Sequence, residues 1–167
     1  RRPAEPSSTP DARLASPVTR SPRFGDIVKL LGGRSVWKKT PTSGLEAHEA
    51  IEKGVPSKAL TYVVDAVTEI PSDKLFDIVG ISKRTVQRKA NVPDTPLSQE
   101  QGSRLWKFAE ILATATELMG DQKSAARWLS SPAIALDGRA PVDLMTTQAG
   151  TEMVEELLIR LEYGVYT

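Results

Sequence analysis

Apolar residues recur along this chain with the spacing of an amphipathic helix, and two segments show the pattern most clearly. The first opens at Ser98 with Gln101 three positions later, which is the spacing of a capping box. It predicts a long helix that ends at Gly120. Its buried face would consist of Leu105, Phe108, Ile111, Leu112, Ala115, Leu118 and Met119. The second segment predicts a helix over 147–163, ended by Gly164. Its buried face would consist of Met153, Val154, Leu157, Leu158 and Leu161.

Shorter segments of the same kind predict helices over 24–31, 45–53, 57–69, 72–79, 82–91, 121–129 and 142–145. Leu45 is expected to face inward in the second of these, and Ser57 is expected to cap the third. The run Tyr62-Val63-Val64 is β-branched and also compatible with a strand. Because no convincing set of pairing strands accompanies it, the fold class predicted for the chain is all-α.

The segment 75–90 has the features of a helix-turn-helix. Leu75 and Val79 would face inward from a first helix, and Gly80 would allow the positive φ that the turn needs. Ile81 would fill the turn, and Ser82 would cap the second helix. In that second helix Val86 and Ala90 are expected to face inward.

The remaining side chains of the second helix are basic or polar and are expected to face outward. Lys83, Arg84, Arg88 and Lys89 give a charge of +4 within seven residues. Arginine and glutamine can read base edges, whereas lysine and serine suit phosphates. The candidate DNA-binding residues are therefore Ser82, Lys83, Arg84, Thr85, Gln87 and Arg88. The alternative interpretation is an ordinary helical hairpin with a solvated basic face.

The composition leaves little material for catalysis. The chain has no cysteine and one histidine, His48, which is expected at the surface. Absence of cysteine removes thiolate nucleophiles, disulfides and cysteine metal sites, and it is compatible with the reducing cytoplasm. No apolar run is long enough to cross a membrane, and the first residues lack the apolar stretch of a signal peptide. An enzyme is therefore a remote alternative, and the sequence calls for no cofactor and no metal.

The charge is unevenly distributed, although the net charge is only +1. Residues 1–23 hold five prolines and carry a net charge of +3, from five arginines, Glu5 and Asp11. They are predicted to be a disordered basic tail. Residues 148–167 carry −3, from four glutamates and Arg160. The acidic helix ends in Tyr163-Gly164-Val165-Tyr166-Thr167. Aromatic residues after a helix stop have little core left to join and often anchor an interface.

Several of these segments together resemble the Xre/MbcA/ParS family of bacterial antitoxins, which are partners of RES-domain toxins. The resemblance rests on Gly-Arg-Ala-Pro at 138–141 within 136–144, on Thr147, Gly150 and Val154-Glu155, and on Glu-Tyr-Gly-Val-Tyr at 162–166. Upstream, residues 80–88 and 125–129 also resemble the family. The resemblance spans about 60–166, and the first fifty or so residues match nothing that can be named.

The resemblance implies an antitoxin that neutralises an NAD-destroying toxin and binds its own operator through the helix-turn-helix. It implies that the end of the chain lies at or in the NAD site of the toxin. That role would fall on Glu162, Tyr163, Gly164, Val165 and Tyr166. Arg139 and Asp143 would instead support the fold, the first in a buried turn and the second at a helix start.

The resulting domain expectation is a tail over 1–23, a helix-turn-helix domain over 24–120 and a toxin-binding domain over 121–167. A homodimer is expected because helix-turn-helix proteins usually read two half-sites. The alternative function is a stand-alone repressor whose last helix serves dimerisation, which explains everything except the aromatic tip.

Overall fold

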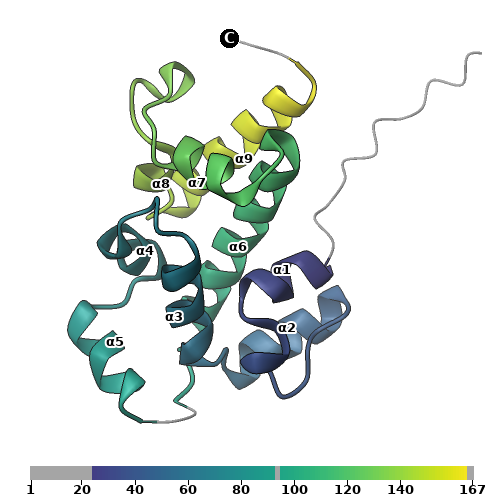
Figure 1. Cartoon of the computed structure of the whole chain (residues 1–167), viewed down its shortest axis with the longest axis vertical. Helices are drawn as coiled ribbons and strands as arrows, with labels where there is room; N and C mark the ends of the chain where they lie inside the picture. The colour runs from purple at the N-terminus through teal and green to yellow at the C-terminus, as the bar shows by residue number, and fades with distance from the viewer. Residues whose placement is uncertain (1–23, 93–94, 165–167) are drawn as a thin grey trace, which may run out of the picture.

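The computed structural model describes residues 24–92 and 95–164 (Figure 1). In those residues the chain forms helices joined by short loops and no strand, so the predicted all-α class is confirmed. The tail expected over 1–23 lies outside the described residues. The elements are α1 (Phe24–Leu30), η1 (Gly33–Ser35), α2 (Gly44–Lys53), α3 (Ser57–Ala66), α4 (Ser72–Val79), α5 (Lys83–Ala90), α6 (Gln99–Met119), α7 (Gln122–Leu129), η2 (Ile134–Leu136), α8 (Pro141–Leu144) and α9 (Gln148–Glu162).

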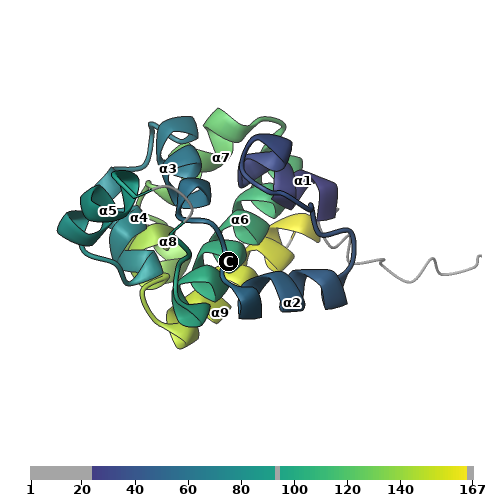
Figure 2. The same cartoon turned by 90° about the horizontal axis from the view of Figure 1, so that it is seen from below.

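Helix α6 is the centre of the molecule, and α1, α2, α4, α7 and α9 all pack against it. Its capping box forms as the sequence predicted: Ser98 Oγ accepts from Gln101 N, and Gln101 Oε1 accepts from Ser98 N. Leu105, Phe108 and Ile111 are almost completely buried along it. Gly120 ends the helix with φ of 92°. Figures 1 and 2 both place α5 on one side of α6 and α1 with α2 on the other.

An aromatic cluster holds the first two helices on α6. The ring of Trp106 lies 6.3 Å from the ring of Phe24 and 6.5 Å from that of Trp37, the latter edge to face. The indole of Trp37 donates a hydrogen bond to Leu31 O at 3.1 Å, which fixes the chain after α1. Residues 24–37, part of the segment that resembled no family in the sequence, therefore contribute to the core.

The last helix lies unusually close to the short helix before it. A Cβ atom built on Gly150 would stand 1.9 Å from the carbonyl oxygen of Leu144, so a side chain there would collide with backbone. Thr147 caps α9 by accepting from Gly150 N, and Thr151 Oγ1 bonds Thr147 O at 2.8 Å. This junction fixes the direction in which α9 leaves α8.

The structure corrects some details of the predicted helices. Helix α3 ends at Ala66 instead of about residue 69, and Ser57 is its first residue and makes no cap hydrogen bond. The run at 62–64 is helical rather than a strand. Leu45 and Met153 were expected to face inward, but they are 68% and 47% exposed because these sides of α2 and α9 face solvent. No helix of the described chain is long and apolar enough to cross a membrane.

Candidate functional site

The helix-turn-helix forms from α4, a three-residue turn and α5, as the sequence indicated. Gly80 adopts φ of 77°, and its N–H and that of Ile81 both donate to Phe76 O, which closes the end of α4. Ile81 is 7% exposed and fills the turn. Ser82 Oγ accepts from Thr85 N at 3.1 Å and lies 2.8 Å from Thr85 Oγ1. The start of α5 is therefore fixed by its own side chains.

The outward face of α5 is basic and polar. Lys83, Arg84, Gln87 and Arg88 are all exposed. Among the described residues, Lys83, Arg84 and Arg88 form no ion pair. Arg84, Gln87 and Arg88 are three and four positions apart, so they share one side of the helix. This is a surface of uncompensated positive charge on a short helix.

Two expectations for α5 are wrong. Lys89 does not reach outward but is half-buried, and its Nζ donates to Pro96 O at 2.9 Å, so it ties α5 to the chain that follows it. Ala90 is exposed rather than inward, which leaves Val86 as the half-buried apolar residue on that side. The sequence had no signal for the first correction, because Pro96 O approaches only after the loop has folded.

The outer face of α9 combines paired charges with exposed apolar side chains. Arg160 donates to Glu156 one turn away. Met153, Ile159 and Tyr163 remain 47%, 44% and 45% exposed, so these apolar side chains are accessible to a partner.

The resemblance assigned the residues at the end of α9 to toxin binding. Glu162, Tyr163 and Gly164 are exposed there, with Gly164 at φ of 67°. Val165 and Tyr166 lie outside the described residues.

Four long-range contacts join the helix-turn-helix part to the last three helices. Lys74 of α4 pairs with Asp143 of α8, which gives Asp143 the structural contact that was expected. Lys107 donates to Glu155 of α9 at 2.9 Å. Gln122 and Ser130 donate to the carbonyl oxygens of Ala66 and Glu69. The sequence did not predict these contacts, because the partners lie 48 to 69 positions apart.

At this junction the Lys107 ammonium lies close to two carboxylates, those of Glu110 and Glu155. Burial acts to lower its pKa, but the hydrogen bond to Glu155 and the charges of Glu110 and Glu155 outweigh that effect. The pKa of Lys107 therefore lies above its ordinary value, and the group is cationic. The contact with Glu155 gives Lys107 a structural role at this junction.

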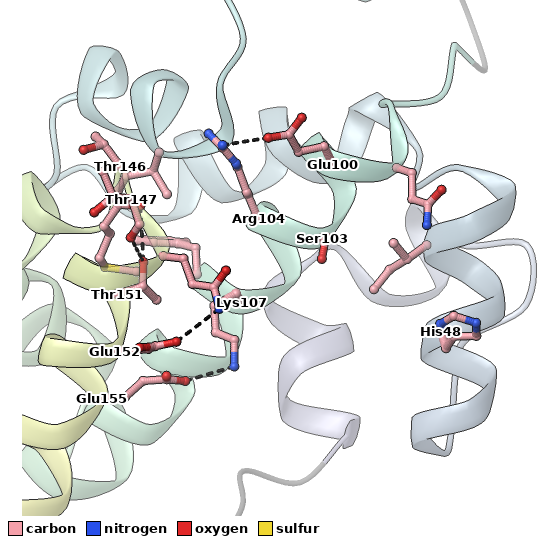
Figure 3. Close-up of a pocket in the computed structure, with 16 residues that line it drawn as sticks. His48, Glu100, Ser103, Arg104, Lys107, Thr146, Thr147, Thr151, Glu152 and Glu155 are labelled. Atoms are coloured by element: carbon pink, nitrogen blue, oxygen red, sulfur yellow. Dashed lines mark hydrogen bonds and ion pairs between the residues drawn. The ribbon is translucent and has the colours of Figure 1, made fainter.

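A groove of about 860 Å³ runs beside this junction, between α2, α6 and the start of α9 (Figure 3). Arg104 pairs with Glu100 at 2.7 Å, and Gln148 bonds Glu152 at 3.1 Å. His48 stands on the opposite wall and pairs with Glu52 on the exposed side of α2. The charged groups of the lining are thus largely satisfied by neighbours. No cluster of His, Asp or Glu in the described residues is placed to hold a metal.

Arg139 differs from its expectation. It was predicted in a buried turn, but its side chain is exposed, because the turn buries Leu136 instead. Within the described residues the Arg139 guanidinium makes no hydrogen bond and no ion pair.

The fold and these surfaces define a helix-turn-helix protein with additional helices after α6. Two models of known families match successive parts of the chain. Residues 46–110 match the antitoxin Xre-like helix-turn-helix domain. Residues 114–164 match the C-terminal toxin-binding domain of the Xre/MbcA/ParS antitoxins. The chain belongs to the Xre/MbcA/ParS-type antitoxin family. Its members are antitoxins and not enzymes, so the enzyme alternative is excluded.

The relatives that match this chain are named as antitoxins. The chain is 31% identical over 124 residues to an antitoxin Xre of Pseudomonas putida, which covers 73% of this chain and 74% of the relative. It is 28% identical over 132 residues to an antitoxin Xre of Yersinia enterocolitica, covering 70% and 88%. It is 29% identical over 125 residues to a Prs ADP-ribosylating antitoxin of a Sphingobium species, covering 70% and 77%.

Proposed function

We propose that this chain is the antitoxin of a RES-domain toxin that destroys NAD, and that it neutralises the toxin by placing its C-terminal end in the NAD site. The observation that carries the proposal is the match of 114–164 to a toxin-binding domain whose last helix leads directly into exposed Glu162, Tyr163 and Gly164. Such a plug works by occupancy: it has to exclude the substrate, while the rest of the interface supplies the affinity.

The exposed apolar side chains support a protein partner on this part of the molecule. Seven large apolar side chains remain exposed in the described residues, and four of them, Ile134, Met153, Ile159 and Tyr163, lie within 114–164. Large apolar side chains left exposed on this part of the chain are available to contact a protein partner.

We further propose that the chain represses its own operon through α5. Arg84, Gln87 and Arg88 would contact bases, and Ser82, Lys83 and Thr85 would contact phosphates. The proposal rests on the exposure of Ser82, Lys83, Arg84, Gln87 and Arg88, beside half-buried Thr85, and on the absence of ion pairs to the three basic residues among the described residues. The chain would act in the cytoplasm as a homodimer on two half-sites. Its DNA-binding domain would extend over 24–120 and its toxin-binding domain over 121–167.

The name of one relative refers to ADP-ribosylation, a reaction that also consumes NAD. A toxin that transfers ADP-ribose to a protein is therefore a second candidate for the partner. The two candidates differ in their product, because NAD hydrolysis leaves proteins unmodified and transfer leaves ADP-ribose on a protein.

The test measures the cellular NAD concentration when the neighbouring toxin gene is expressed alone, with the full chain, and with the chain lacking 164–167. We expect NAD to fall with the toxin alone, to be preserved by the full chain and to fall again with the truncated chain. Blotting for ADP-ribosylated protein in the same cells separates hydrolysis from transfer. If neither the NAD level nor the ADP-ribosylation of protein changes in any of the three strains, the antitoxin proposal is contradicted and the stand-alone repressor is favoured.

A further inference from the structure

The loop between α7 and α8 closes on itself through its backbone. Ala133 N donates to Arg139 O at 3.0 Å, and Gly138 N donates back to Ala133 O at 3.0 Å. Between them, Arg139 N donates to Leu136 O at 3.1 Å, and the Leu136 side chain is buried in the core. Asp137 and Gly138 hold positive φ values of 54° and 76° that complete the turn. The loop is thus a fixed projection and its geometry is set before any partner arrives.

This fixed projection holds Ile134 almost entirely in water. Its side chain is 96% exposed, against 68% for Leu45, the next most exposed large apolar residue of the described chain. An isoleucine in that position contributes nothing to the core. Single apolar residues occur on many surfaces, but here a loop closed by its own backbone hydrogen bonds holds one, next to the Ala133–Arg139 pair, in water. The loop therefore presents an apolar group for contact with something other than this chain.

The loop also carries exposed Asp137 and the exposed guanidinium of Arg139, which stands at the base of the same turn without an ion pair among the described residues. Arginine is enriched at the energetically important positions of protein interfaces, and its planar group binds carboxylates with two hydrogen bonds. Ile134 and Arg139 together fit a partner surface with an apolar pocket beside an acidic group.

The position of the loop in the chain indicates that the toxin is the partner that it contacts. The loop lies within 114–164, the toxin-binding domain. Figure 1 shows it at the upper end of the molecule, the end toward which α9 runs, whereas α5 lies toward the lower end. A protein held at the end of α9 would therefore be able to contact the loop without approaching the DNA-binding face.

We propose that Ile134 and Arg139 are a second anchor for the toxin, separate from the C-terminal plug and occupying an apolar pocket flanked by a carboxylate on the toxin surface. This inference rests on the proposed function. A rigid loop loses little conformational entropy on binding, so its contacts contribute to affinity more fully than those of a flexible segment. Such an anchor would belong to the part of the interface that supplies the affinity, whereas the plug excludes the substrate.

The experiment measures the affinity of the full chain and its variants for the purified product of the neighbouring toxin gene by isothermal titration calorimetry. We expect Ile134→Asp to weaken binding about 10- to 100-fold, because it removes a buried apolar contact and adds a charge to an apolar pocket. Arg139→Glu should weaken binding about tenfold, with a larger effect at low ionic strength. Leu45→Asp, a matched change of an exposed residue outside the toxin-binding domain, should change affinity less than twofold.

Thermal unfolding and binding of the operator DNA should be the same for Ile134→Asp as for the unchanged chain, since the side chain buries nothing in the fold. Affinity of Ile134→Asp within twofold of the unchanged chain would overturn the second anchor, and loss of NAD protection on deleting 164–167 would still uphold the plug. If Ile134→Asp instead dissociates a homodimer in analytical ultracentrifugation, the loop contacts a second copy and the proposal is wrong. Absence of any toxin binding by the unchanged chain would overturn both.

Discussion

Helices α5 and α9 belong to one small fold, yet each is built in a different way. Helix α5 buries no residue completely and is held by its Ser82 cap, by half-buried Val86 and by the Lys89 hydrogen bond to Pro96. Helix α9 buries Gly150, Thr151, Val154, Leu157 and Leu158 and still leaves apolar side chains outside. Helix α5 presents basic side chains that form no ion pair among the described residues, whereas α9 presents apolar side chains beside the Glu156–Arg160 ion pair.

This difference matches two kinds of partner. A phosphate backbone is recognised by uncompensated cations, and the affinity depends strongly on salt. A folded protein is recognised by apolar side chains held rigidly by a core, with charged pairs around them. If the two surfaces work in this way, changes on one should leave the other partner unaffected.

The largest expected effect is on DNA. Replacing Arg84 and Arg88 together by alanine should weaken operator binding by about 3–4 kcal/mol, since each removes a cation that is placed to contact the groove or the backbone. The measurement is operator affinity by fluorescence anisotropy at several salt concentrations, with toxin affinity measured in parallel. Toxin affinity should not change. Equal losses of both affinities would mean that the two surfaces are not separate.

Next in size is the effect of adding a side chain at the close contact between α8 and α9. Gly150→Ala should lower the free energy of unfolding by about 2–3 kcal/mol, because the added Cβ meets the Leu144 carbonyl group. Urea unfolding measures this, and Ala149→Ser at the neighbouring exposed position is the control. Toxin binding should decline more than operator binding. An unchanged midpoint would show that α9 can shift without cost.

The sequence predicted the helices best where a local signal marks their ends. Ser98 with Gln101, Ser82 and the glycines at 80 and 120 all act within a few residues, and each boundary they predict agrees with the structure. The end of α3 was predicted too late because Val67 continues the apolar spacing, but its backbone leaves the helical region with ψ of 68°.

Side-chain environments were harder to predict than helix ends, because they depend on distant parts of the chain. Lys89 finds Pro96 O, Arg139 is exposed since Leu136 takes the buried place, and Lys107 meets Glu155 across two helices. None of these follows from helical periodicity. Four of the candidate DNA-binding residues lie exposed on α5, but the two last residues of the candidate plug lie outside the described chain, so that assignment stays a prediction.

A smaller effect is expected at the ion pair that joins the two halves. A double-mutant cycle with Lys107→Met and Glu155→Gln should give a coupling energy of about 0.5–1 kcal/mol, because both side chains are more than a third exposed or nearly so and solvent screens them. The Glu156–Arg160 pair on the outer face of α9 is the matched control and should give less than about 0.5 kcal/mol. Equal coupling for both pairs would remove the special role of Lys107 at the junction.

The smallest effect is expected on α2, which carries neither surface. The pKa of Glu46 is lowered from 4.5 to about 2, first by the side-chain hydrogen bond from Thr42, then by the Thr42 backbone N–H and by Lys39. Because the folded pKa lies below the unfolded one, the stabilisation is complete above about pH 4.5 and is lost as pH falls toward 2.

Melting temperatures of Glu46→Gln and of the unchanged chain should therefore differ slightly at pH 7 and converge near pH 2, with Glu49→Gln as the exposed control on the same helix. Operator and toxin affinities at neutral pH should be unaffected by either change, since both glutamates lie outside α5, α9 and the α7–α8 loop. A difference in melting temperature that persists unchanged down to pH 2 would contradict the hydrogen-bonded carboxylate. A change in toxin affinity would mean that the toxin also contacts α2, so that the toxin-binding surface is not confined to the C-terminal part of the chain.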